Sequence, residues 1–209
     1  MIDMSIPEYH IFMYKDDTDQ YPHYCLPEGF SFKFYEEGDE VEWAKIEHSL
    51  GQFATVEEGV KCFRREFIDG QALNAKERVL FVIAPDGGYA ATAAVWDGNF
   101  FGEHINRLHW LAVSDKYAGN GIAKALFTRL LDLYNELGLS GRLHLWTGAR
   151  YFVAISMYRK FGFIEYTGEV EPCSNQKSED FVRKTAMALE IVNERLARAK
   201  AQRAAKSGS

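Results

Sequence analysis

The sequence lacks any apolar run that approaches the roughly 20 residues needed for a membrane-spanning helix. Its first 25 residues carry five acidic side chains in place of the basic start and apolar middle of an export signal. Cysteine is scarce: Cys25, Cys62 and Cys173 are odd in number and far apart, which argues against a disulfide framework and a zinc site. These absences predict a soluble cytoplasmic protein with reduced thiols, no bound metal and no membrane partner.

What the sequence does contain is enough apolar material for a sizeable core. With 209 residues, of which 47% are hydrophobic and 14% aromatic, the chain is most simply one domain with extensions. The net charge of −6 is uneven, because residues 195–209 hold five basic side chains and no acid, which leaves 19 basic against 30 acidic residues elsewhere. An acidic body argues against nucleic acid as the main partner and favours a cationic or amine substrate; a merely solubilising surface is the alternative.

Alternating and helical hydrophobic patterns predict an α/β chain. Thr55 and Glu58 form a capping box for one helix, and Asp39 is the expected N-cap of the helix before it. We divide the chain into an N-terminal extension (1–27), a central domain (28–170), and a C-terminal loop and long helix with a basic tail (171–209). Strands are predicted at 9–14, 30–35, 78–84, 89–96, 105–113, 142–147 and 163–170, and helices at 39–50, 55–68, 122–137, 151–161 and 179–205.

The most informative stretch of the chain is residues 113–127. An apolar strand pattern at 108–113 gives way to a glycine-rich turn at 118–121, and a helical pattern follows at once. Gly119 and Gly121 permit a tight turn with uncovered N–H groups, and the helix N-terminus adds further unpaired N–H groups. Such a loop binds an anion, typically a phosphate, although a plain tight connection is the alternative when the turn is taken alone.

Two common phosphate-binding loops do not fit this turn. A Walker loop needs Gly-Lys-Ser/Thr at its end, whereas Lys124 follows Ala123 and precedes Ala125. A dinucleotide fingerprint that begins at Gly119 needs a small residue at position 124 and an acid about twenty residues further on, and neither is present.

Residues 118–123, Ala-Gly-Asn-Gly-Ile-Ala, resemble the acetyl-CoA pyrophosphate loop of the GCN5-related N-acetyltransferase (GNAT) family, Arg/Gln-x-x-Gly-x-Gly/Ala. Residues 151–163 independently resemble the second motif of that family, Asn-x-x-Ala-x-x-x-Tyr-x-x-x-Gly-Phe, with Tyr151 in place of the Asn. The resemblance covers residues 28–170. It implies the acyl-CoA N-acyltransferase fold: a central mixed β-sheet flanked by helices, followed here by a long C-terminal helix.

The resemblance also implies that acetyl-CoA is the co-substrate and where it binds. The end of the strand at 105–113 would pair with the amides of the pantetheine arm, as in strand addition, and the glycine loop would hold the pyrophosphate. The implied cofactor-binding residues are Leu111, Ala112, Val113, Ala118, Gly119, Asn120, Gly121, Ile122, Ala123, Lys124, Tyr151 and Ala154.

Tyr158 is the catalytic acid that the second motif implies. Its hydroxyl, with a reference pKa of about 10, stays protonated at neutral pH and can donate to the departing CoA thiolate. The alternative for Tyr158 is a packing role in the core.

The general base is less well defined by the resemblance, because Arg107 occupies the position where some family members carry Glu. His109, two residues on, has a reference pKa near 6.5 and is our candidate base. The alternative for His109 is a half-buried histidine held by hydrogen bonds. Glu103 and His104 are weaker candidates, and His144, which alternates with leucines, is expected to be structural.

Taken together, these features predict an N-acetyltransferase that joins acetyl-CoA to a primary amine of a small molecule or peptide by direct attack. One alternative is a catalytically silent acyl-CoA-binding or regulatory module, favoured by Ala118 and Arg107. Another is an interaction protein that works through its basic C-terminal helix. An apolar stripe on that helix predicts a homodimer, unless it packs on its own domain: Val182, Thr185, Leu189, Val192, Leu196 and Ala199.

Overall fold

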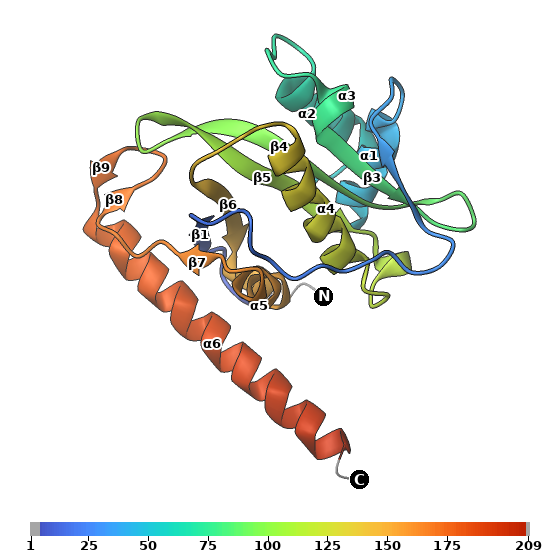
Figure 1. Ribbon diagram of the computed structural model, residues 1–209. Helices are drawn as coiled ribbons and strands as arrows, with labels where there is room; N and C mark the ends of the chain where they lie inside the picture. Colours follow the sequence, from blue (N-terminus) through green and yellow to red (C-terminus); the bar gives the residue numbers. More distant parts are fainter. Residues whose placement is uncertain (1–4, 208–209) are drawn as a thin grey trace. The chain divides into compact units, whose positions relative to one another are not determined.

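The computed structural model describes residues 5–207, so the ends of the predicted N-terminal extension and basic tail, 1–4 and 208–209, lie outside the described residues. The chain divides into two compact units, unit 1 (1–21, 97–106 and 141–209) and unit 2 (22–96 and 107–140). A mixed sheet has seven strands in the order β2-β3-β4-β5-β6-β1-β7, and helices flank it (Figure 1). The predicted mixed sheet, flanking helices and long C-terminal helix are therefore confirmed.

Unit 2 contains the two early helices, the β3–β4 hairpin and the helix that follows the glycine loop. The strands predicted at 78–84 and 89–96 form a hairpin, since β3 and β4 pair antiparallel across a turn in which Gly87 has a φ of 78°. A short helix before β3 was not predicted. Residues 97–100 of β4 and 103–106 of β5 belong to unit 1. The elements are β2 (Ser31–Phe34), α1 (Glu40–Ser49), α2 (Val56–Phe67), α3 (Ala75–Arg78), β3 (Val79–Ile83), β4 (Tyr89–Phe100), β5 (Glu103–Val113), η1 (Asp115–Tyr117) and α4 (Ile122–Glu136).

The core of unit 2 is an aromatic cluster beneath α1 and α2. Trp43, Phe63 and Phe67 are each at most 1% exposed, and their rings lie 4.8 to 6.3 Å apart. The two helices approach closely at Gly59, where an added Cβ would lie 2.7 Å from the Cβ of Ala44. A larger residue at Gly59 would push α2 away from α1 and open this cluster.

The caps of the two early helices differ from each other. The Thr55–Glu58 capping box is confirmed, because both of its hydrogen bonds are present at the start of α2. Asp39 is the N-cap residue of α1, as predicted, but its side chain makes no capping hydrogen bond. Asp39 has helical backbone angles, and its carboxylate instead pairs with Lys33 and accepts a 2.6 Å hydrogen bond from the Tyr89 hydroxyl. The ion pair with Lys33 therefore replaces the cap.

β4 and β5 are longer than predicted. The strands predicted at 89–96 and 105–113 leave a connection between them, but β4 continues to Phe100 and β5 begins at Glu103. The connection is the pair Phe101 and Gly102, with φ values of 57° and 74°, as in a two-residue type I′ hairpin turn. Glycine and asparagine usually indicate a loop, but here Gly98 and Asn99 lie in β4 and Gly102 lies in the turn.

Unit 1 contains β1 in the interior of the sheet, although residues 1–27 were assigned to an extension. β1 pairs antiparallel with both β6 and β7, with Phe12 opposite Trp146 and Met13 opposite Leu145. Part of the predicted N-terminal extension is therefore a strand of the central sheet. The elements are β1 (His10–Lys15), β6 (Leu143–Gly148), η2 (Ala149–Tyr151), α5 (Phe152–Lys160), β7 (Ile164–Glu165), β8 (Val170–Glu171), β9 (Gln176–Lys177) and α6 (Glu179–Ser207).

The strand predicted at 163–170 is largely wrong. Only Ile164–Glu165 joins the sheet, and β8 pairs with β9 in a separate two-stranded sheet. Thr167 and Gly168 separate the two strand pieces, and glycine weakens a strand because it adds backbone freedom and no side chain to pack.

Helix α6 packs on its own unit along one face. Figure 1 shows it running from the β8–β9 hairpin and extending beyond the rest of unit 1. Its buried residues form a face rotated from the predicted stripe, and Val182 is 39% exposed. No helix within residues 5–207 combines the length and the apolar character that crossing a bilayer demands. The buried residues of α6 are Phe181, Thr185, Ala188 and Val192.

Candidate functional site

The glycine loop of unit 2 connects η1 to α4 and has two left-handed glycines. Gly119 has a φ of 86° and Gly121, the N-cap of α4, a φ of 80°. An added Cβ at either glycine would meet no atom within 4 Å, so the loop faces open space. The glycines are needed for the backbone angles themselves and not for close packing.

The main chain of the loop presents a row of uncovered donors. In the described part of the chain, the N–H groups of residues 119–123 donate to no protein acceptor, and regular helical bonding resumes with Lys124 N–H to the Gly121 carbonyl at 3.1 Å. These N–H groups lie at the N-terminus of a 15-residue helix, where its dipole is positive. The arrangement fits a polyanion such as a pyrophosphate.

A hydrogen-bond network fixes the segment that leads into the loop. Asp86, in the β3–β4 turn, accepts hydrogen bonds from the Tyr117 hydroxyl at 2.8 Å and from the Lys116 ammonium at 2.7 Å, and these hold its pKa at about 2. The Asn120 side chain donates to the Tyr117 carbonyl at 3.1 Å. Gly88 has no room for a Cβ, which would lie 2.3 Å from the Tyr117 hydroxyl. The β3–β4 turn therefore holds the glycine loop in place.

β5 carries a left-handed residue in its interior. Trp110 has a φ of 49°, which is uncommon for a bulky residue, and we interpret this break in the extended backbone as a β-bulge. As a result consecutive residues point to the same side: the His109 ring lies 6.0 Å from Phe67, and the Trp110 ring 5.0 Å from Trp43. No sequence signal identified this bulge, which lies immediately before Leu111.

His109 meets a carboxylate that the sequence did not suggest. Its Nε2 lies 3.4 Å from Oε2 of Glu66, and an Arg107 guanidinium nitrogen lies 3.8 Å from the same oxygen. Hydrogen bonding to His109, followed by the charges of Arg107 and Arg65, holds the pKa of Glu66 below its usual range although burial opposes this. Glu66 is therefore ionised at neutral pH and lies between a histidine and an arginine.

Glu47 is a second carboxyl group on this side of unit 2, and it is buried. It is 2% exposed, and burial raises its pKa to about 8. It follows Trp43 by one helical turn of α1, so the two side chains lie on one face. Among the described residues, Glu47 Oε1 and the indole nitrogens of Trp43 and Trp110 have no hydrogen-bond partner. At neutral pH the folded protein mainly holds Glu47 protonated.

The residues of the second predicted motif lie in unit 1. Tyr158 is on α5 and 7% exposed, and burial, then the nearby Tyr151, raises the pKa of its hydroxyl. Tyr151 ends η2, and Ala154 is half-buried in the first turn of α5. The predicted site residues are thus divided: 109–124 belong to unit 2, and 151–158 to unit 1.

The other candidate bases belong to unit 1 and have different surroundings. His104 is exposed and pairs with Asp97 at 3.4 Å, and Glu103 is exposed. Burial, then the nearby Arg142, lowers the pKa of His144 despite opposing hydrogen bonds, and its Nδ1 has no hydrogen-bond partner in the described chain. His109 and His104 each pair with a carboxylate from another element, but the His109 side chain is 18% exposed and that of His104 is 66% exposed.

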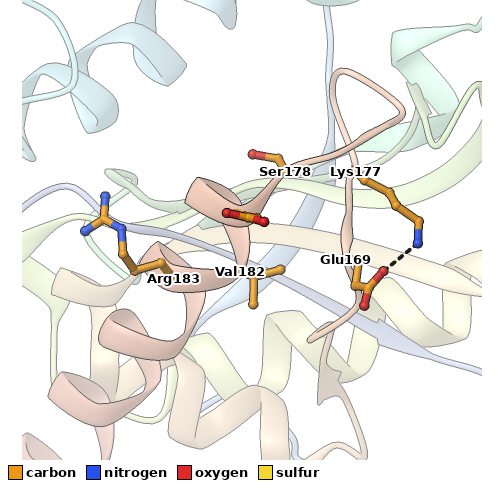
Figure 2. Close-up of a pocket in the computed structure, with 6 residues that line it drawn as sticks. Glu169, Lys177, Ser178, Val182 and Arg183 are labelled. Atoms are coloured by element: carbon orange, nitrogen blue, oxygen red, sulfur yellow. Dashed lines mark hydrogen bonds and ion pairs between the residues drawn. The ribbon is translucent and has the colours of Figure 1, made fainter.

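A pocket of about 520 Å³ lies in unit 1 at the β8–β9 hairpin and the start of α6 (Figure 2). Its charges are mostly paired, since Lys177 lies 2.7 Å from Glu169 and Arg183 pairs with Asp180. None of the predicted site residues, all within the described range, lines it. Its walls are formed by Glu169, Lys177, Ser178, Glu179, Val182 and Arg183.

Comparison with known proteins identifies the fold of the chain. The model of the Acetyltransferase (GNAT) family matches residues 12–163. The crystal structure of a GCN5-related N-acetyltransferase from Sphaerobacter thermophilus is similar at 22% identity and a TM-score of 0.59, over 76% of this chain and 49% of that one. An acetyltransferase of the GNAT family from Colwellia psychrerythraea is similar at 14% identity and a TM-score of 0.56, over 75% of this chain and 53% of that one.

These likenesses are limited in two ways. At such identities the solved structures show the fold alone, and this chain spans about half the length of each. No curated protein matches the sequence.

Proposed function

Because the chain belongs to the GNAT acetyltransferase family, we propose that it transfers the acetyl group of acetyl-CoA to a primary amine of a small molecule or peptide. The observation that carries this proposal is the row of N–H groups at residues 119–123, which in the described chain have no protein acceptor. A main-chain cradle at the start of a long helix suits the pyrophosphate of acetyl-CoA. Because these donors are main-chain groups, the usual Arg or Gln at position 118 is dispensable for binding.

The strand before the loop would bind the pantetheine arm. The bulge at Trp110 interrupts the regular strand immediately before Leu111, which favours the use of the backbone at Leu111, Ala112 and Val113 by a ligand amide. Tyr151 and Ala154 would contact the same arm from the start of α5.

Side chains would carry the proton transfers. The amine nitrogen bonds to the thioester carbonyl carbon, and His109 accepts the proton that the nitrogen loses. The C–S bond breaks with its electron pair on sulfur, and Tyr158 donates its hydroxyl proton to that sulfur. His109 then returns its proton to solvent, and Tyr158 recovers one. Burial raises the pKa of Tyr158, so its hydroxyl stays protonated across the neutral range and keeps the proton to be donated.

Two measurements test the proposal. Calorimetry should show binding of acetyl-CoA, and the release of CoA thiol should accelerate when a panel of primary amines is added. We expect release to depend on both the amine and the protein. If acetyl-CoA binds but no amine in the panel accelerates the release of CoA, the transferase assignment is contradicted. If acetyl-CoA does not bind, the assignment of the loop is contradicted.

The runner-up function is a catalytically silent acyl-CoA-binding or regulatory module. It is favoured by Ala118 at the usual Arg/Gln position and by Arg107 at the position of the Glu in some relatives. It predicts acetyl-CoA binding with no release of CoA, so the same pair of measurements separates the two functions.

We further propose that the protein acts in the cytoplasm as a homodimer and binds no nucleic acid. α6 supports the dimer, since Val182 and Met187 remain 39% and 37% exposed on a helix that also buries an apolar face. Sedimentation of the full chain and of a chain that ends at Asn193 tests this. A monomer in both cases would rule out the dimer. A dimer of both chains would fit a contact through Val182 and Met187, which the shorter chain keeps, and a dimer of the full chain alone would assign the contact to the part of α6 after Asn193.

A further inference from the structure

Glu66 is the penultimate residue of α2, and it bridges that helix to β5. Its Oε2 lies 3.4 Å from His109 Nε2 and 3.8 Å from an Arg107 nitrogen, so one oxygen meets both side chains. The three side chains are between 16% and 28% exposed, which makes the contact stronger than a surface ion pair. Glu66 and His109 are 43 positions apart, and only the tertiary structure brings them together.

Glu66 supplies a carboxylate that β5 itself lacks. Arg107 occupies the position of β5 where some family members carry Glu, and its guanidinium group is directed at Glu66. The carboxylate beside the candidate base therefore comes from α2 and not from β5. Arg65, on the adjacent position of α2, lies 3.6 Å from the other oxygen of Glu66 and completes its set of cationic partners.

We propose that Glu66 is a positioning residue for His109, whose Nε2–H it accepts, so that Nδ1 is the nitrogen that takes the proton of the acceptor amine. This inference rests on the proposed function only in naming the transferred proton as that of the acceptor amine. The coupling between Glu66 and His109 does not depend on that function. The hydrogen bond selects the Nε2–H tautomer, since a neutral imidazole carries its proton on the nitrogen that donates.

The charges around His109 give the coupling a direction. Glu66 favours the imidazolium form, and Arg107, which reaches the same oxygen, opposes it. The His109 ring lies beside Glu66 and Phe67 on α2 and beside Trp110 on β5. Arg65 and Arg107 both contact the Glu66 carboxylate. Removing the negative charge of Glu66 therefore leaves the positive charges of Arg107 and Arg65 near His109 without that carboxylate, which lowers the pKa of His109.

The test is the titration of the His109 ring, followed by NMR in the full chain, with His109→Gln used to assign its resonance. In Glu66→Gln the His109 pKa should fall by about one unit, the size expected for the loss of one nearby opposite charge. Glu57→Gln, an exposed carboxyl on the same helix, is the matched control and should leave the titration unchanged. An unchanged His109 titration in Glu66→Gln overturns the inference.

A second variant keeps the inference falsifiable when Glu66→Gln does not fold. Arg107→Gln removes the opposing cation and should move the His109 pKa upward. A shift downward, or none, overturns the coupling.

The kinetic readout decides whether this coupling serves the reaction. The acidic limb of the pH profile of kcat/KM should move in Glu66→Gln by as much as the NMR titration moves. A limb that stays in place while the titration shifts overturns the positioning role. Failure of the wild type to acetylate any amine contradicts the proposed function instead, and the NMR titration still decides the coupling.

Discussion

The glycine loop and the face formed by α1, α2 and β5 both belong to unit 2, but they present different chemistry. The loop offers main-chain N–H groups at residues 119–123, in open space. The other face offers side chains: Glu66 beside His109, and Glu47 among aromatic rings. A main-chain site should depend on backbone conformation and tolerate changes of side chain, whereas a side-chain site should respond to the loss of single atoms. The predictions below test this difference.

The largest expected effect is a loss of turnover when one side-chain hydroxyl is removed. Tyr158→Phe removes only a hydroxyl, so it should lower turnover about 100- to 10,000-fold while acetyl-CoA affinity is kept. Steady-state kinetics with the best amine of the panel, together with calorimetry, measures both quantities. Full activity of the variant across the pH range would eliminate Tyr158 as the acid.

The next effect is on the main-chain site. Gly121→Val places a β-branched residue at a φ of 80°, which costs about 1 to 3 kcal/mol or shifts the loop, so acetyl-CoA affinity should fall about 5- to 150-fold. Gly121→Asn is the matched control, because Asn adopts this conformation more readily and its side chain meets open space. Equal affinity of the wild type and the valine variant in calorimetry would show that the loop assignment is wrong.

A third prediction concerns Glu47 and pH. Its folded pKa of about 8 lies above its usual 4.5, so the folded state holds a proton that the unfolded chain releases. Stability should therefore be lost as pH rises from about 4.5 towards 8, and Glu47→Gln should remove this loss. The variant should match the wild type near pH 4, below the unfolded pKa, and exceed it near pH 9 by up to about 5 kcal/mol.

Urea unfolding of both proteins at the two pH values measures the difference. The matched control is Glu57→Gln, which changes an exposed carboxyl group on α2. A gap between wild type and Glu47→Gln that does not widen with pH would mean that Glu47 is ionised in the folded protein.

The smallest effect should follow the loss of a charged side chain at the loop. The Lys124 ammonium lies 5.0 Å from the Tyr24 ring centre, and the main-chain N–H of Lys124 already donates to the Gly121 carbonyl. Lys124→Ala should weaken acetyl-CoA binding less than about fivefold, because Lys124 is half-buried against Tyr24 and one solvent-accessible charge contributes about 1 kcal/mol or less. A loss larger than that of Gly121→Val would reverse the contrast between the two sites, since the loop would then act through its side chains.

Much of the fold could be predicted because its signals are local. The capping box at Thr55, the β3–β4 turn and the start of α4 after Gly121 each depend on residues within a few positions of one another. The prediction failed where a distant partner decided the outcome. The Asp39 side chain pairs with Lys33 and Tyr89 and makes no capping hydrogen bond to α1, and the strand at 163–170 breaks after Glu165.

The sequence by itself determined the glycine loop and the element order around it, because the backbone angles that the loop needs are set by glycines close together in the chain. Only the tertiary structure decided which side chains face His109. The bulge at Trp110 turns two consecutive residues to one side, and helix packing at Gly59 holds α2 against α1 while Glu66 reaches β5. Hydrophobic periodicity reports which face of an element is buried and not which residue it meets, so a pair formed across two elements leaves no local signal.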